Sequence, residues 1–287
     1  MAGGIDIACG QITWRRGEFT QPEILAQIAK AGYAGAPASA PSIDEVDAVR
    51  AMFDEAGLRP APGYLGAAFW DPDQAGEIVA RAGEMAAIAA ALSLTEVYVA
   101  ANLTPERRAV SGHVRAEDAL DDAGYATMAG TLNRVGEATL IHGVRASFHN
   151  HVGSFIETRA EIDELFSRVD HSLVFHGPDV GHLAWAGDDV VSYVRDYLDE
   201  ITTMHIKDIN PEVRLQGVAE SWDYSTFSDH GIFTELGTGF VDFPAMFDVL
   251  RDRRFSGWIV VETDVTQLPT ALESATVSRD YLRSLDM

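Results

Sequence analysis

Short apolar runs alternate with longer amphipathic stretches along the whole chain. The runs are rich in β-branched and aromatic residues, and between them apolar positions recur at the three- and four-residue spacing of a helix. This alternation predicts eight βα units. The strands are expected at residues 5–14, 32–38, 59–65, 96–101, 144–151, 172–175, 202–209 and 258–263.

The starts of several helices carry a signal of their own. In a capping box, a Ser or Thr and a Glu three residues later satisfy free backbone N–H groups. Three pairs have this spacing: Thr20 with Glu23, Ser42 with Glu45, and Thr158 with Glu161. Further helices are expected at 73–92, 116–142, 189–200, 243–253 and 268–285. Because no Pro- or Ser-rich linker divides the chain, we expect residues 1–287 to form one domain.

Eight parallel βα units of this length close into a barrel more readily than they form an open sheet. We therefore predict an α/β fold, a single (β/α)₈ (TIM) barrel, with a doubly wound sheet as the alternative. Catalytic groups of such barrels lie at the C-terminal ends of the strands and in the loops that follow. The segment 210–241 after strand seven is too long for a plain connection. Two interpretations of this segment stay open. It forms a lid over the barrel mouth, or it is a packing excursion or a subunit contact.

Composition narrows the chemistry. The single cysteine, Cys9, excludes an internal disulfide and any thiolate metal site, so a metal would need His, Asp and Glu ligands. With 21 basic against 44 acidic residues, the net charge of −23 would repel nucleic acids and anionic membranes. The longest apolar stretch, 85–94, is too short to cross a bilayer. We expect a cytoplasmic protein with neither a nucleic-acid nor a membrane partner.

Metal-ligand residues gather where four successive predicted strands end. Alternation puts His149 and His151 on one side of strand five. A lone histidine is more often structural than a ligand, but a closed barrel would bring all these groups together. A cluster of carboxylates and imidazoles without a cation would be costly. The groups are His149, His151 and Glu157 after strand five, Asp179 and His182 after strand six, His205, Lys207 and Asp208 on strand seven, and Glu262 and Asp264 on strand eight.

This ligand chemistry suits Mn²⁺, Mg²⁺, Co²⁺, Fe²⁺ or Zn²⁺, and spacing does not choose among them. Lys207 stands out because Lys30 is the only other lysine in the chain. Alternation along strand seven places Lys207 on the same side as His205. An ammonium group in the barrel mouth can donate to a substrate oxygen or to an oxyanion.

Aromatic and glycine residues give a first view of the substrate. Trp14, Trp70 and Trp185 fall at or just after predicted strand ends, where indole faces would pack against the C–H faces of a sugar. A pure core role for each is an equal alternative. Gly237-Thr238-Gly239 has no Lys or Arg nearby to hold a phosphate, so we interpret it as a turn and favour an unphosphorylated substrate.

These motifs resemble the xylose isomerase-like TIM-barrel superfamily. Within it, the chain is most similar to the inosose dehydratases and related sugar isomerase/epimerase proteins. The resemblance covers nearly the whole chain and is most specific from His149 onward. The segments that carry it are His149-Asn150-His151 with Glu157, Asp179-Val180-Gly181-His182, His205-Ile206-Lys207-Asp208, 231–239 and 257–262.

The resemblance implies one divalent metal, for which we expect Mn²⁺ ahead of Co²⁺, Mg²⁺, Fe²⁺ and Zn²⁺. Carried onto this chain, the ligands are Glu157, Asp179, His205 and Glu262. His149, which stands where many members have Glu, is the substitute for Glu157. The segment 176–182, His-Gly-Pro-Asp-Val-Gly-His, departs from the family's usual Asp-Thr-Gly-His. Such changes leave the substrate open, because loop residues set it.

The implied activity is proton transfer on a small sugar or polyol ketone. If the adjacent hydroxyl leaves, the enzyme is a dehydratase. If the proton returns, it is an epimerase or isomerase, and β-elimination would cleave a 3-keto C- or O-glycoside. The expected roles are general base for His149 or His151, proton donor for His182 or Lys207, and substrate binding for His182, Trp14 and Trp185.

Two other functions are alternatives to this activity. A non-catalytic barrel that binds a sugar or supports a partner subunit would not need stoichiometric metal, and the sequence also leaves a homo-oligomer open. An AP-endonuclease-like enzyme would need more metal ligands and a basic surface facing DNA, which the net charge of −23 argues against.

Overall fold

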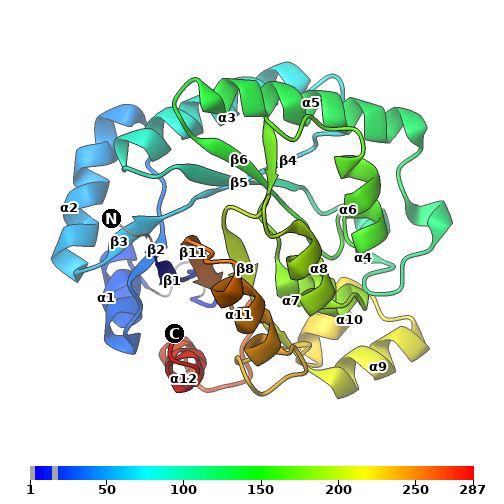
Figure 1. Ribbon diagram of the computed structural model, residues 1–287. Helices are drawn as coiled ribbons and strands as arrows, with labels where there is room; N and C mark the ends of the chain where they lie inside the picture. The colour runs from blue at the N-terminus through cyan, green and yellow to red at the C-terminus, as the bar shows by residue number, and fades with distance from the viewer. Residues whose placement is uncertain (1–3, 15–18) are drawn as a thin grey trace.

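The computed structural model describes residues 4–14 and 19–287 and has parallel strands in the middle with helices around them (Figure 1). The strands form one sheet of five in the order β3-β2-β1-β11-β8 and one of four in the order β4-β5-β6-β7. The two sheets meet where β3 runs on into β4, and where single parallel bridges join His176 to Ile201 and Asp179 to His205. With β3 and β4 counted as one position, the ring has eight positions, and the predicted (β/α)₈ barrel is confirmed.

Most of the observed strands are shorter than the predicted ones, whereas β5 has the predicted bounds. Residues 202–209 are interrupted at Lys207, and the short strand β9 beyond it pairs antiparallel with β10. The strands are β1 (Ile5–Cys9), β2 (Gly35–Pro37), β3 (Arg59–Ala61), β4 (Tyr64–Ala67), β5 (Glu96–Ala101), β6 (Arg145–His149), β7 (Val174–His176), β8 (Met204–Ile206), β9 (Asp208–Ile209), β10 (Phe233–Thr234) and β11 (Gly257–Val261).

The third position of the barrel consists of two short strands, each paired with a different neighbouring strand. β3 pairs with β2 and β4 pairs with β5, with Pro62 and Gly63 between them. Proline has no N–H to donate to a ladder. At Gly63 a Cβ atom would lie 2.7 Å from the carbonyl oxygen of Ala38, so only glycine allows this close approach. The segment predicted as one strand is therefore two.

Helices cover the outside of the ring, and α1 lies against α12, so the first and last units close the barrel (Figure 1). Thr20 and Thr158 form the predicted capping boxes, whereas Ser42 precedes a 3₁₀ turn (Ile43–Glu45) and α2 starts after it. The helices are α1 (Gln21–Ala31), α2 (Val46–Ala56), α3 (Ala75–Ala91), α4 (Pro105–Arg108), α5 (Asp122–Leu140), α6 (Arg159–Phe166), α7 (Val180–Ala186), α8 (Val190–Tyr197), α9 (Pro211–Glu220), α10 (Tyr224–Asp229), α11 (Phe243–Asp252) and α12 (Ala271–Ser284).

The segment 210–241 is folded rather than an extended loop, since it contains α9, α10 and β10. Its last part wraps around the carboxylate of Asp208, which accepts N–H groups from Gly237 at 2.9 Å, Gly239 at 2.9 Å and Val241 at 3.1 Å. A Cβ atom at Gly239 would lie 2.2 Å from this carboxylate. The Gly-Thr-Gly turn therefore serves an internal side chain.

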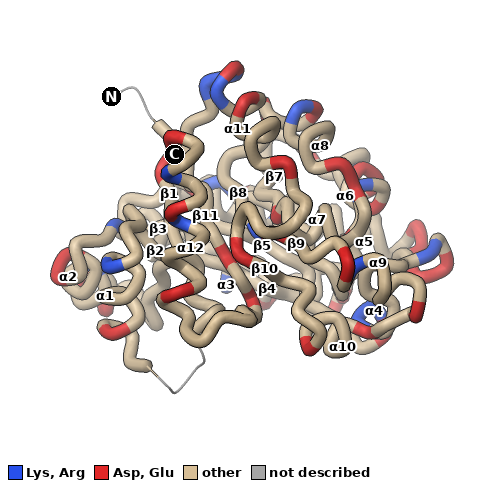
Figure 2. The backbone as a smooth tube through the Cα atoms, turned by 90° about the horizontal axis from the view of Figure 1, so that it is seen from below, with Lys and Arg blue, Asp and Glu red and all other residues tan. Residues whose placement is uncertain are grey.

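The acidic excess is carried by the outer helices. Figure 2 shows Asp and Glu distributed over helices on all sides, with fewer Lys and Arg among them. Such a surface is strongly hydrated and repels other anions. Among the helices of residues 4–14 and 19–287, none has the length and apolar composition of a membrane span.

Arg107 forms a buried ion pair beneath this surface. Arg107 of α4 donates from both terminal nitrogens to Glu161 of α6, at 2.6 and 3.1 Å, and lies 3.8 Å from Glu157. The side chain of Arg107 is 1% exposed. Bidentate pairing of this kind fixes the relative position of two segments. It ties α4 to the loop that follows β6.

Arg107→Ala should destabilise the protein by about 3–5 kcal/mol, because it leaves two buried carboxylates without a cation to balance their charge. The measurement is urea unfolding followed by circular dichroism. The matched control is Arg115→Ala, which removes an arginine of the same region whose partner Glu117 is 3.8 Å away and exposed. Exposed pairs contribute little. Equal losses in the two variants would contradict a structural role for the buried pair.

Candidate metal centre

Side chains from four strand ends meet at the mouth of the barrel. His149 ends β6, Asp179 follows β7, His205 lies in β8 and Glu262 follows β11. One ligand atom each of His149, Asp179 and His205 lies within 4.8 Å of the others. The carboxylate of Glu262 is 3.1 Å from Nδ1 of His205. The structure thus brings together Asp179, His205 and Glu262, which are far apart in the sequence.

Two buried polar atoms in this group lack a hydrogen-bond partner among the described residues. Oδ1 of Asp179 accepts N–H groups from Gly181 at 2.9 Å and His182 at 3.1 Å, as the N-cap of α7. Oδ2 of Asp179 and Nε2 of His205 are buried and accept no hydrogen bond from the described residues, although the ammonium of Lys207 lies 3.2 Å from Oδ2. Buried polar atoms are almost always satisfied in folded proteins. A cation between these atoms would satisfy both, so the residues fit a bound metal.

His149 is oriented as a metal ligand would be. Its Nδ1 lies 3.1 Å from the carbonyl oxygen of Gly177, which can only accept, so Nδ1 carries the proton. Nε2 then keeps its lone pair and lies 3.7 Å from Oδ2 of Asp179. Burial, with the neighbouring histidines, lowers the pKa of His149 well below its usual value and keeps the ring neutral. Outer hydrogen bonds of this kind orient ligating histidines.

Glu157, the ligand expected after strand five, lies apart from this group. Its two oxygens accept N–H groups from Gly112 at 2.7 Å and Gly153 at 2.9 Å, and Arg107 is 3.8 Å away. Burial raises the pKa of Glu157 to about 7. The carboxylate is therefore engaged in holding loops together.

A second group lies beside the first. His151, His182 and Asp264 each offer a ligand atom, again within 4.8 Å of one another. Nδ1 of His151 donates to the carbonyl oxygen of Val152 at 2.7 Å, and burial lowers the pKa of His151 to about 4. Burial also raises the pKa of Asp264 to about 6. The sequence placed Asp264 among the polar groups at the strand ends but gave it no role as a ligand or catalytic residue, although its alternation with Glu262 indicates the same side of the strand.

Lys207 joins the two groups. Its Nζ donates to Glu262 at 2.7 Å and to Asp264 at 2.5 Å, and lies 3.2 Å from Asp179. Burial alone would lower the pKa of Lys207, but the three carboxylates outweigh burial and raise the pKa well above its usual value. The ammonium group therefore stays charged.

Of the three tryptophans at the predicted strand ends, Trp14 and Trp185 are buried and Trp70 is half-buried. Trp185 is fully buried and stacks on His182, with ring centroids 6.0 Å apart. Trp14 is buried as well and donates from its indole nitrogen to Gln27 at 3.0 Å. Trp70 packs edge to face on Phe155 at 4.9 Å. Trp185 thus supports His182 from behind.

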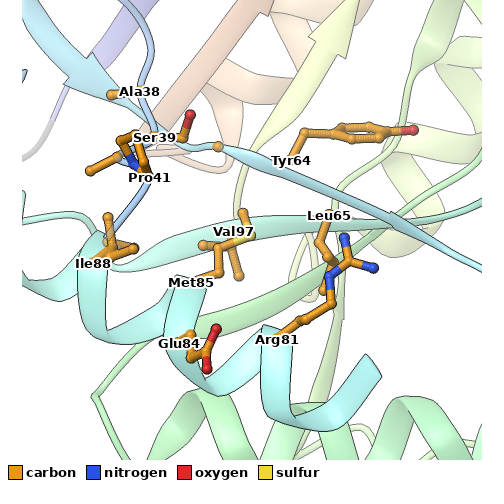
Figure 3. A pocket seen from close by; sticks show the side chains of 13 residues that line it. Ala38, Ser39, Pro41, Tyr64, Leu65, Arg81, Glu84, Met85, Ile88 and Val97 are labelled. Atoms are coloured by element: carbon orange, nitrogen blue, oxygen red, sulfur yellow. The ribbon is translucent and has the colours of Figure 1, made fainter. Parts of the chain in front are cut away.

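A cavity of about 280 Å³ opens onto these groups, with Ile12, Pro37 and Tyr64 in its other wall. A hollow of about 350 Å³ on the outside, between α3 and residues 38–41, also touches Tyr64, whose ring points away from Met85 and Glu84 (Figure 3). The clustered groups with shifted pKa values lie in the mouth cavity, which is the signature of a functional site. We assign the candidate site there.

His176 is buried but lies outside the mouth groups. Its ring stacks between Phe166 at 3.6 Å and Tyr197 at 4.6 Å, and Nδ1 is 2.7 Å from the hydroxyl of Tyr193. Burial lowers the pKa of His176 to about 3. His176 is therefore a neutral packing residue.

His176→Phe should make the protein less sensitive to acid. Below about pH 6.5 the unfolded chain binds a proton that folded His176 does not bind until about pH 3, so the free energy of unfolding falls in that window. Between pH 7 and 5 this residue accounts for about 2 kcal/mol of the loss. Urea unfolding at both pH values measures the difference. Exposed His142→Phe is the control, and an equal acid loss in wild type and H176F would contradict the assignment.

Several known proteins resemble this chain in sequence or in fold. A family model described as xylose isomerase-like TIM barrel matches residues 25–285. An inosose dehydratase of Clostridium botulinum is 31% identical over 157 residues, 54% of this chain, so the match spans about half (53%) of that relative's length. A D-allulose 3-epimerase from Methylomonas superposes with a TM-score of 0.70 at 16% identity, covering 99% of this chain and 98% of its own. A 3-keto-D-glucoside 4-epimerase from E. coli gives 0.70 at 17% identity, covering 98% and 99%.

Proposed function

This chain belongs to the family of xylose isomerase-like TIM barrels, and from that premise we propose a metal-dependent enzyme that acts on a small unphosphorylated sugar or polyol ketone. The reaction begins with removal of a proton from the carbon next to the carbonyl. The observation that carries the proposal is the convergence of Asp179, His205 and Glu262 at the barrel mouth, with buried ligand atoms that accept no hydrogen bond from the described residues.

His149, Asp179, His205 and Glu262 would hold the ion. His149 takes the place expected for Glu157, since the carboxylate of Glu157 is occupied by backbone N–H groups. Mn²⁺ is the first choice, and Co²⁺, Mg²⁺, Fe²⁺ and Zn²⁺ suit the same ligands. A bound divalent ion polarises the ketone and acidifies the neighbouring C–H bond.

The remaining groups move and hold protons. His151 is the general base, because its Nδ1–H donates to the carbonyl oxygen of Val152 and its Nε2 keeps a lone pair that can accept a proton. Lys207 stays protonated and stabilises negative charge on a substrate oxygen rather than giving up its proton. His182, whose ring nitrogens have no protein partner, binds the substrate or returns the proton.

The cavity favours a small neutral substrate. Its volume of about 280 Å³ is at the lower end of ligand pockets, which start near roughly 300 Å³. Among the described residues that line it, Lys207 is the one cation, and three carboxylates already surround it. A phosphate would meet negative charge there, so an unphosphorylated ketone fits better.

Three outcomes of the same proton removal remain to be ordered. Dehydration of an inosose is our first choice, supported by the inosose dehydratase relative. Epimerisation or isomerisation is the alternative, supported by the two epimerases of the same fold. Cleavage of a 3-keto-glycoside uses the same first step, with a sugar-linked group leaving instead of water.

Asp179→Asn and Glu262→Gln should each weaken metal binding by at least about 100-fold, since even outer-sphere changes cost 10- to 100-fold. Turnover should fall with the metal. Metal content is measured by mass spectrometry after dialysis, and turnover by product analysis on inososes, ketoses and 3-keto-glycosides. Glu157→Gln is the control that should retain one equivalent of metal.

Full activity in a metal-free Asp179→Asn protein would reject the proposal. Treatment of wild type with EDTA should abolish turnover, and added Mn²⁺ or Co²⁺ should restore it. A barrel that only binds a sugar would bind the ketones unchanged and form no product with any metal.

A further inference from the structure

The mouth contains two sets of three metal-ligand residues that share no member. The first set is His149, Asp179 and His205, which belongs to the proposed metal centre. The second set is His151, His182 and Asp264, with its ligand atoms equally close together. The proposed metal centre uses only the first set. The proposed function gives His151 and His182 separate roles in proton transfer and substrate binding, but it does not explain why they are grouped with Asp264 as metal ligands would be.

His182 is the strongest pointer to a cation at the second set. It is fully buried, and neither Nδ1 nor Nε2 has a hydrogen-bond partner in the part of the chain that the structure describes. Nε2 lies 3.9 Å from Oδ2 of Asp179 and 4.0 Å from Oδ2 of Asp264. A buried imidazole aimed between two carboxylates is arranged as a ligand is.

The Lys207 ammonium lies between the two sets. It is 3.2 Å from Asp179 of the first set and 2.5 Å from Asp264 of the second, and 2.7 Å from Glu262. Its side chain is 2% exposed. A Cβ atom at Gly181 would lie 2.4 Å from Cβ of Lys207, so a glycine in α7 makes room for this lysine.

Charge balance then limits the number of metal ions. The carboxylates of Asp179, Glu262 and Asp264 carry three negative charges, which one ammonium and one divalent ion neutralise. A second divalent ion would leave a net charge of +2 in a buried site, which is strongly unfavourable. We propose that Lys207 acts as a built-in cation that takes the place of a second metal, and that His151, His182 and Asp264 form a second divalent-cation site which opens when Lys207 is removed. This inference rests on the proposed metal centre.

The test counts metal ions. Wild type, Lys207→Ala and Lys207→Gln are dialysed against Co²⁺, and bound cobalt is measured by mass spectrometry and by its visible absorption. Wild type should bind one equivalent. Both variants should bind two, and the second equivalent should raise their thermal unfolding midpoint. Lys207→Gln preserves most of the side chain and serves if Lys207→Ala does not fold.

Matched variants locate the second ion. Lys30→Ala removes the other lysine of the chain, which is exposed on α1, and should leave one equivalent bound. Adding Asp264→Asn or His182→Gln to Lys207→Ala should return the count from two to one. One equivalent in both Lys207 variants at saturating Co²⁺, or two in wild type, would overturn the inference.

The failure of this inference is distinct from failure of the proposed function. If wild type binds one ion and the Lys207 variants also bind one, only the second site is wrong. If wild type binds one ion but turns over no ketone, the proposed reaction is wrong and the ion count still decides the second site. If wild type binds none, both fail.

Discussion

The burial of Asp179, Glu262 and Asp264 around one ammonium group governs the mouth of this barrel. Each carboxylate alone would be well hydrated on a surface, but closure of the strand ring removes water from all three and places them near one another. Repulsion among them is relieved only by positive charge. The ammonium of Lys207 supplies part of this positive charge. The buried atoms of Asp179 and His205 that accept no hydrogen bond from the described residues mark where further positive charge is required. Binding of the proposed metal would therefore stabilise the folded mouth.

Close backbone approaches hold these groups in place. At Gly10 a Cβ atom would lie 2.2 Å from the carboxylate of Glu262, and at Gly181 it would lie 2.4 Å from Cβ of Lys207. At Gly177 it would lie 2.8 Å from Ser147, and the carbonyl of Gly177 orients His149. Three strand ends can approach the same centre only where the adjoining chain lacks a side chain. The unusual His-Gly-Pro segment is thus part of the support for the site.

The sequence was sufficient to predict the eight strands and the meeting of Asp179 and His205, because alternation and strand ends dictate both. It was not sufficient to predict that Glu157 lies apart from the metal-ligand group. The carboxylate of Glu157 is engaged by backbone N–H groups of Gly112 and Gly153, and Gly112 lies in a turn with no periodic signal, so this contact is visible only in three dimensions. The burial of Trp185 was equally hidden, since Tyr224 and Phe227 cover it from a segment that we could describe only as long. Local patterns give the position of a side chain on its own element, but not the neighbours that distant elements bring to it.

The two halves of the chain contribute differently to the mouth cavity. The titratable groups His149, His205 and Glu262 come from the second half, whereas Ile12, Pro37 and Tyr64 of the opposite wall come from the first. The wall residues contain no metal-ligand group, so they can change without disturbing the charge balance around Lys207. Conversely, an altered ligand would disturb every buried charge of the centre at once. In the proposed enzyme, variation in the first half would therefore select among sugar and polyol ketones while the proposed proton transfer stays constant, which is how one barrel can serve several substrates.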